Sequence, residues 1–104
     1  MTFRLPGQIS STHLLDTGAN ALEVEILAEK ASALGRAGER AERMLARLSE
    51  HDGDSEMRLK LVKEAAKAVY AYFIQRELCG FRRHDDIIRE YAIPREVIVR
   101  LGAM

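Results

Sequence analysis

The sequence predicts an all-α protein, built as one long antiparallel helical hairpin followed by two short helices. Three observations predict this class. Apolar residues recur every three or four positions through two long segments in which Gly and Pro are scarce. A polar stretch with the turn-favouring pair Asp52-Gly53 separates these segments. Charged residues make up 31% and hydrophobic residues 47% of the 104 residues, the balance of a single folded helical domain.

The amino-terminal residues 1–18 are predicted to form an arm, separate from a single helical domain over residues 19–104. Pro6-Gly7 marks a turn, and no helical period is sustained in this segment. The arm carries too many large apolar side chains for a purely solvated tail. We therefore expect some of them to dock on the body of this or a neighbouring subunit.

A first helix is predicted over residues 20–50. Asn20 and Glu23 have the spacing of a capping box, with Asn in the place of Ser or Thr. Because Gly38 costs about 1 kcal/mol relative to Ala inside a helix, we expect another helix to approach closely there. Small and apolar residues alternate at spacings of four and three, which places them on one seam: Leu27, Ala31, Leu34, Gly38, Ala41, Leu45 and Leu48.

A second helix is predicted over residues 55–79, after a chain reversal in which Asp54 or Ser55 can cap the helix. A short loop between two long amphipathic helices predicts an antiparallel hairpin, with arms roughly 40 Å long at about 1.5 Å per residue. The apolar face of the second helix is wide because it carries two neighbouring stripes: Leu59, Val62, Ala66, Val69 and Phe73, and beside them Leu61, Ala65, Ala68 and Tyr72.

Two short helices are predicted to follow, over residues 85–92 and 94–101. Gly80 is a good terminator of the second helix, and Asp85 is a good cap for the third. Pro94 lacks an N–H and has a fixed φ, so it suits the first turn of the fourth helix.

The hairpin has more apolar surface than its own short helices can cover, since they reach only about one end of it. A second copy of the chain is the economical cover, because two hairpins related by twofold symmetry make a four-helix bundle. We therefore expect a homodimer that acts as a non-enzymatic protein–protein interaction module.

Arg76 occupies a position on the first apolar stripe where an apolar residue is due. A turn near Asp52 puts residue 76 opposite residue 28, which makes Glu25 or Glu29 its expected partner. One interpretation is a semi-buried ion pair that fixes the register of the hairpin. The alternative is an anion-binding or catalytic cluster that also includes Glu77.

A basic stripe runs along one face of the first helix at spacings of four, three and four: Arg36, Arg40, Arg43 and Arg47. Such stripes are usually solvated or bridge subunits, and Glu39 precedes Arg43 by four residues as a supporting pair. The alternative is contact with a phosphate backbone or an acidic partner, which lysines of the second helix could extend: Lys60, Lys63 and Lys67.

The segment 86–101 has the outline of a helix-turn-helix, with Ala92 at the position where that motif prefers Gly. Ile88, however, stands where the motif needs a small residue. If the segment bound DNA, Arg95 and Arg100 would be the contacts, although the residues expected to be exposed on its second helix are poorly suited to reading bases. A small DNA-binding or regulatory protein is therefore an alternative function, and two short helices packing on the hairpin explain the same pattern.

Composition argues against several classes of function and partner. Sixteen Lys and Arg balance sixteen Asp and Glu, whereas proteins that coat nucleic acid or anionic membranes are usually strongly basic. Three scattered histidines and no Glu-x-x-His pair lead us to expect no metal and no cofactor. The longest apolar stretch, residues 68–74, is too short to cross a membrane, and we find no signal-peptide pattern. The single cysteine, Cys79, favours a reducing compartment, so we expect a cytoplasmic protein.

Three segments carry a resemblance to a known family: 20–38 (NALEVEILAEKASALGRAG), 72–80 (YFIQRELCG) and 91–97 (YAIPREV). They resemble a small bacterial family of uncharacterised helical proteins, and the resemblance spans nearly the whole chain. It implies a standalone bacterial cytoplasmic domain and carries no activity, ligand or catalytic residue.

Overall fold

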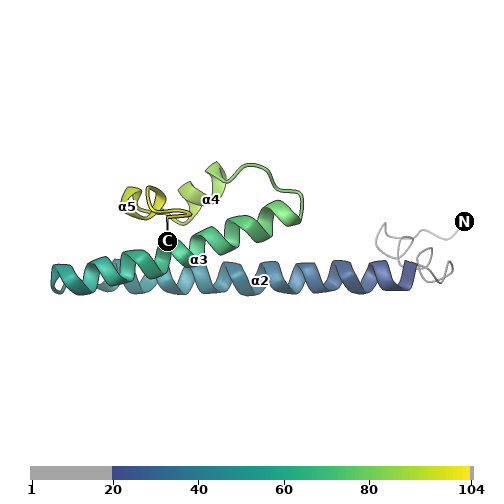
Figure 1. Cartoon of the computed structure of the whole chain (residues 1–104), viewed down its shortest axis with the longest axis horizontal. Helices are drawn as coiled ribbons and strands as arrows, with labels where there is room; N and C mark the ends of the chain where they lie inside the picture. Colours follow the sequence, from purple (N-terminus) through teal and green to yellow (C-terminus); the bar gives the residue numbers. More distant parts are fainter. Residues whose placement is uncertain (1–19, 104) are drawn as a thin grey trace, which may run out of the picture.

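The structure of the protein, a computed structural model, describes residues 20–103 (Figure 1). The predicted arm over residues 1–18 lies outside the described residues. Four helices follow one another: α2 (Asn20–Glu50), α3 (Ser55–Leu78), α4 (Asp85–Glu90) and α5 (Arg95–Ile98). The described part holds no strand, which confirms the predicted all-α class with a long helical hairpin.

The hairpin of α2 and α3 has a register set by two contacts. A Cβ atom at Gly38 would lie 3.2 Å from Cε1 of Tyr72, so the absence of a side chain lets the ring pack on α2 as predicted. Near the far end of α3, the Cys79 thiol lies 3.9 Å from the carbonyl oxygen of Lys30. The α2 residues before Lys30 therefore extend beyond the end of α3, as Figure 1 shows, over about 15 Å at about 1.5 Å per residue.

The central layer of the fold is α3, which lies between α2 and the two short helices (Figure 1). Its Tyr72 stripe faces α2, and its Phe73 stripe faces the carboxyl-terminal segment, where Phe73 stacks on His84 with ring centroids 4.1 Å apart. The Arg58–Glu96 ion pair also joins α3 to α5. The core residues come from all three layers: Ala41, Leu45 and Leu48; Leu61, Val62, Ala65, Ala66, Ala68, Val69, Tyr72 and Phe73; Ile87, Ile93 and Val97.

This layering changes one sequence-based expectation. The wide apolar face of the second helix is largely covered by the chain's own carboxyl-terminal segment, because α4 and α5 lie along α3 rather than at its end (Figure 1). Apolar periodicity predicts that a face is buried, but it does not say by what.

Helix ends agree with the predicted turn chemistry, with small corrections. Asp54 caps α3, since its Oδ1 accepts a hydrogen bond of 2.7 Å from the backbone N–H of Met57. The cap of α4 is His84 rather than Asp85, which is already helical and favours the positive helix start. Pro94 precedes α5, and the two short helices end earlier than predicted because turns replace their last residues.

The ends of α3 and α4 have the same hydrogen-bonding pattern, the Schellman motif, in which a left-handed residue follows the helix. After α3 this residue is Gly80, with φ of +99°, and the N–H of Phe81 donates to the carbonyl of Arg76. After α4 it is Ala92, with φ of +50°, the described non-glycine residue with a positive φ. The residue that stands at the Gly position of the helix-turn-helix outline thus adopts the conformation that glycine favours.

Candidate functional site

Arg76 is the buried charged side chain of the described core, with 7% of its surface exposed. Its Nε donates to Nδ1 of His84 over 3.1 Å, and its Nη2 donates to the carbonyl oxygen of Arg83 over 3.0 Å. The guanidinium also lies 3.5 Å from Oδ1 of Asp86 and 4.8 Å from the ring centroid of Phe81. Arg76 therefore ties the last turn of α3 to the loop that leads into α4.

His84 extends this network to Glu77. Because Nδ1 of His84 accepts from Arg76, the proton of the neutral ring belongs on Nε2, which lies 2.9 Å from Oε2 of Glu77. Every buried side-chain polar atom in the described residues has a hydrogen-bond partner. The cluster of Arg76, His84, Glu77 and Asp86, which we call the Arg76 clamp, is thus a network whose buried polar atoms are all hydrogen-bonded.

The expected pairing of Arg76 with Glu25 or Glu29 is not what the structure shows. From the Gly38–Tyr72 contact to the turn, α2 has twelve residues and α3 has seventeen, counted to Glu50 and from Ser55. This stagger of about one helical turn places Arg76 between the levels of Gly38 and Lys30. Glu25 and Glu29 lie beyond the end of α3, where they line a shallow groove with Gln75.

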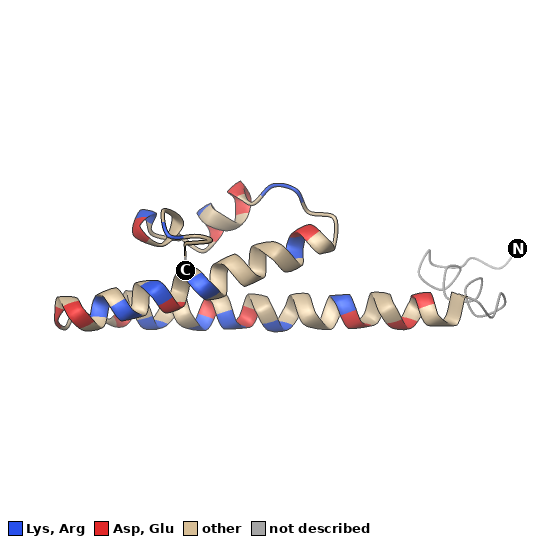
Figure 2. Cartoon of the chain, viewed as in Figure 1, with Lys and Arg blue, Asp and Glu red and all other residues tan. Residues whose placement is uncertain are grey.

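The predicted basic stripe on α2 is exposed at all four arginines. It lies on the helix face turned away from α3, because Arg43 is two residues from both Ala41 and Leu45, which are buried against α3. Basic and acidic residues interleave along the ribbon of α2 in Figure 2, which agrees with a solvated face. No described carboxylate pairs with these arginines within 4 Å.

The helix-turn-helix outline yields a short second helix. With four residues, α5 is about one turn long, whereas a recognition helix lies along the major groove and presents several side chains to it. Val97 is fully buried against the core, Arg95 is exposed, and Arg100 lines a groove beside α3. The structure therefore does not bring Arg95 and Arg100 together on an extended recognition surface.

Sequence reasoning missed an exposed apolar surface at the end of the molecule where α2 extends beyond α3. Leu22 and Leu27 on α2 are 62% and 60% exposed, and Leu78 at the end of α3 is 60% exposed. Ile26 also belongs to this surface, and a groove of about 280 Å³ runs beside it. Six of the ten exposed large hydrophobic residues in the described part come from the start of α2, the end of α3 or the loop that follows α3: Leu22, Ile26, Leu27, Ile74, Leu78 and Phe81.

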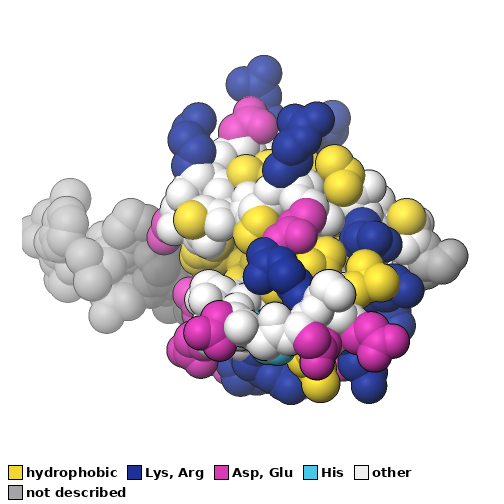
Figure 3. Space-filling view, turned by 90° about the vertical axis from the view of Figure 1, so that its left-hand side faces the viewer, with side chains coloured by type: hydrophobic (Ala, Val, Ile, Leu, Met, Phe, Trp, Pro, Cys, Tyr) yellow, Lys and Arg dark blue, Asp and Glu magenta, His cyan; other side chains and the backbone are white. Residues whose placement is uncertain are grey.

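The opposite end of the molecule is different in character. Figure 3 looks onto the hairpin turn, where acidic and basic side chains surround the apolar areas. We call the apolar region of Leu22, Ile26 and Leu27 the α2 overhang. The sequence signal that could have located the α2 overhang is the seam of the first helix. This seam begins at Leu27, which lies beyond the end of the second helix.

Within residues 20–103 the structure holds neither a cluster of metal ligands nor a membrane-spanning helix. No group of three His, Cys, Asp or Glu residues there could hold a metal ion. None of the helices α2 to α5 combines the length and apolar character needed to cross a bilayer.

The fold and its surfaces define a small helical-hairpin protein with a buried arginine clamp and an exposed apolar overhang. The chain belongs to a family of unknown function, DUF6665, whose model matches residues 8–104. This confirms the resemblance to an uncharacterised family. No curated protein matches the chain significantly, and no solved structure does.

Proposed function

We propose that the protein is a non-enzymatic interaction module of the cytoplasm whose first partner is a second copy of itself, held through the α2 overhang. The observation that carries this proposal is the exposure of Leu22, Ile26 and Leu27 on the segment of α2 that extends beyond the end of α3. Large apolar side chains gathered on one exposed segment are typical of interaction sites. The single Cys79 suits a reducing compartment.

The charges of the overhang favour a second copy as the occupant. Glu23, Ile26, Leu27 and Lys30 are spaced by three, one and three residues, so they share one helix face. In a twofold antiparallel pair centred between Ile26 and Leu27, each Ile26 meets the partner's Leu27. The same register sets each Glu23 against the partner's Lys30. The face is therefore self-complementary in both charge and apolar character.

The test is a charge exchange across this pairing. We expect a dimer of the full chain at micromolar concentration in analytical ultracentrifugation. Glu23→Lys and Lys30→Glu each create two like-charge contacts and weaken the dimer by about tenfold, which is about 1.4 kcal/mol. The double exchange restores opposite charges and should recover most of the affinity.

The matched control is Glu39→Lys, a similar charge change on an exposed position of α2 beyond the overhang. It should leave the dimer unchanged. A wild-type chain that stays monomeric at about 100 µM contradicts the proposal. So does a double exchange that remains as weak as the single variants, because the face would then not pair in this register.

A further inference from the structure

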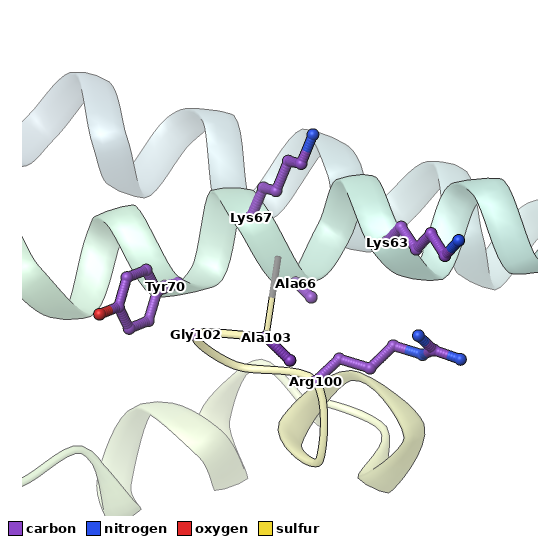
Figure 4. Close-up of a pocket in the computed structure, with 7 residues that line it drawn as sticks. All are labelled: Lys63, Ala66, Lys67, Tyr70, Arg100, Gly102 and Ala103. Atoms are coloured by element: carbon purple, nitrogen blue, oxygen red, sulfur yellow. The ribbon is translucent and has the colours of Figure 1, made fainter.

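A second surface lies apart from the overhang, between α3 and the turn that follows α5. It is a groove of about 530 Å³ that Figure 4 shows in close-up. Ligand pockets for small molecules usually have volumes of about 300–1,000 Å³. The groove is therefore large enough to take an organic molecule.

The charged side chains along this groove all have the same sign. Lys63 and Lys67 come from α3, and Arg100 comes from the turn after α5. No described acidic residue lines the groove, and none of the three cations has a described carboxylate within 4 Å. In a chain of zero net charge, three cations around one hollow form a local positive field that attracts an anion.

The groove has one aromatic end and one cationic end. In Figure 4 the ring of Tyr70 stands at one end, while Lys63 and Arg100 extend together toward the other. Between them the lining is small and apolar, formed by Ala66 and Ala103. Lys67 points away from the groove in the same view.

Gly102 packs against Tyr70 at the aromatic end of the groove. Its φ is +78°, and a Cβ atom there would lie 3.3 Å from Cε1 of Tyr70, so the chain passes close to one edge of the ring. The ring still exposes part of its surface to the groove. A partly exposed aromatic ring of this kind can stack with a planar apolar group.

We propose that this groove binds a small organic anion with a planar apolar body and one anionic head group. The body lies on Tyr70 and Ala66, and the head lies between Lys63 and Arg100. Carboxylate, phosphate and sulfonate heads share the chemistry that the two cations recognise.

The experiment compares two fluorescent probes that differ in charge, 1-anilinonaphthalene-8-sulfonate and its uncharged parent N-phenyl-1-naphthylamine, on the full chain. The anionic probe should bind with a micromolar dissociation constant that rises with salt. The variant Lys63→Met with Arg100→Met should weaken the anionic probe at least tenfold and leave the neutral probe within about twofold. The matched control is Arg36→Met with Arg40→Met on the outer face of α2, which should change neither.

Amide chemical shifts locate the bound probe, because an apolar dye can also bind the overhang. Shifts at Tyr70, Gly102 and Ala103 support the groove. Shifts confined to residues 22–27 overturn the proposal, as does equal binding of the anionic probe by the Lys63 and Arg100 double variant. A carboxylate probe, 2-naphthoate, and a phosphate probe, 2-naphthyl phosphate, then decide which head group binds more tightly. Because the groove variants leave the overhang intact, failure here does not bear on self-association.

Discussion

Replacing Arg76 with Met removes the centre of the Arg76 clamp while keeping a side chain of similar length. Two hydrogen bonds disappear, and the acceptors on His84 and Arg83 lose their donor. Bonds to a charged group contribute about 1.5–3 kcal/mol each, and the apolar replacement recovers part of that loss. The Asp86 side chain is 66% exposed, so its ion pair adds at most about 1 kcal/mol. We expect a net loss of about 3 kcal/mol in the free energy of unfolding.

The loss is measured by urea and thermal unfolding followed by circular dichroism. For a domain of this size, about 3 kcal/mol corresponds to a decrease of roughly 12–24 °C in Tm. Arg89→Met is the matched control, since Arg89 lines the groove beside the clamp but is exposed and has no described ion pair. It should change stability by less than about 0.5 kcal/mol.

A second variant separates the observed clamp from the pairing expected from sequence. The double change Glu25→Gln with Glu29→Gln removes both carboxylates that the sequence suggested for Arg76. Because Arg76 has other partners in the structure, the free energy of unfolding of this double variant at low protein concentration should stay within about 0.5 kcal/mol of wild type. A loss above about 1 kcal/mol, or a loss below about 1 kcal/mol for Arg76→Met, refutes the reasoning.

Three further predictions concern helix ends and a partly buried phenol. Ala92→Gly should stabilise the protein by about 0.5–1 kcal/mol, because φ of +50° strains an alanine. Gly80→Ala should destabilise it by about 1–2 kcal/mol. Urea unfolding should therefore show stability changes of opposite sign for the two variants, and changes of equal sign contradict the shared motif. Asp54→Ala should cost about 1 kcal/mol by removing the cap of α3, and Asp54→Asn should retain most of it in the same assay. Burial, with a hydrogen bond to Tyr72, raises the pKa of Tyr91 from 10.0 to about 12. The neutral phenol therefore stabilises the fold below pH 10, and this contribution is lost as the pH rises from 10 to 12. Ultraviolet titration should show one tyrosine that ionises at higher pH than a free tyrosine does. Tyr91→Phe should abolish that step.

The long helices could be predicted from sequence because their signals are local. The capping residues, the polar turn and the apolar spacing gave 20–50 and 55–79, against Asn20–Glu50 and Ser55–Leu78 in the structure. Each signal acts within about one or two turns of the chain. The close approach at Gly38 followed from the same reasoning, since a neighbouring helix is a physical reason for a glycine on the seam.

The partner of Arg76 could not be predicted because it depends on register. The sequence locates the turn but not the stagger between the two helices, and one helical turn of stagger moves Arg76 away from Glu25 and Glu29. Its actual partners follow Gly80: Arg83 and His84 lie in the loop before α4, and Asp86 lies in the first turn of α4. Arg76 continues the Phe73 stripe of α3, and in the structure this stripe faces the carboxyl-terminal segment rather than α2.

The α2 overhang links the fold to the proposed association through a single helix. An isolated helix of about ten residues is marginal in water, so residues 20–29 gain their order from continuity with the packed half of α2. That half is fixed by Leu45 and Leu48, which are buried against α3, whereas Leu27 is exposed. Substitutions at Leu45 or Leu48 therefore act on folding, and substitutions at Leu27 act on whatever covers the overhang. Because a cover orders the free end as well as burying it, association and helix stability in this segment must be coupled.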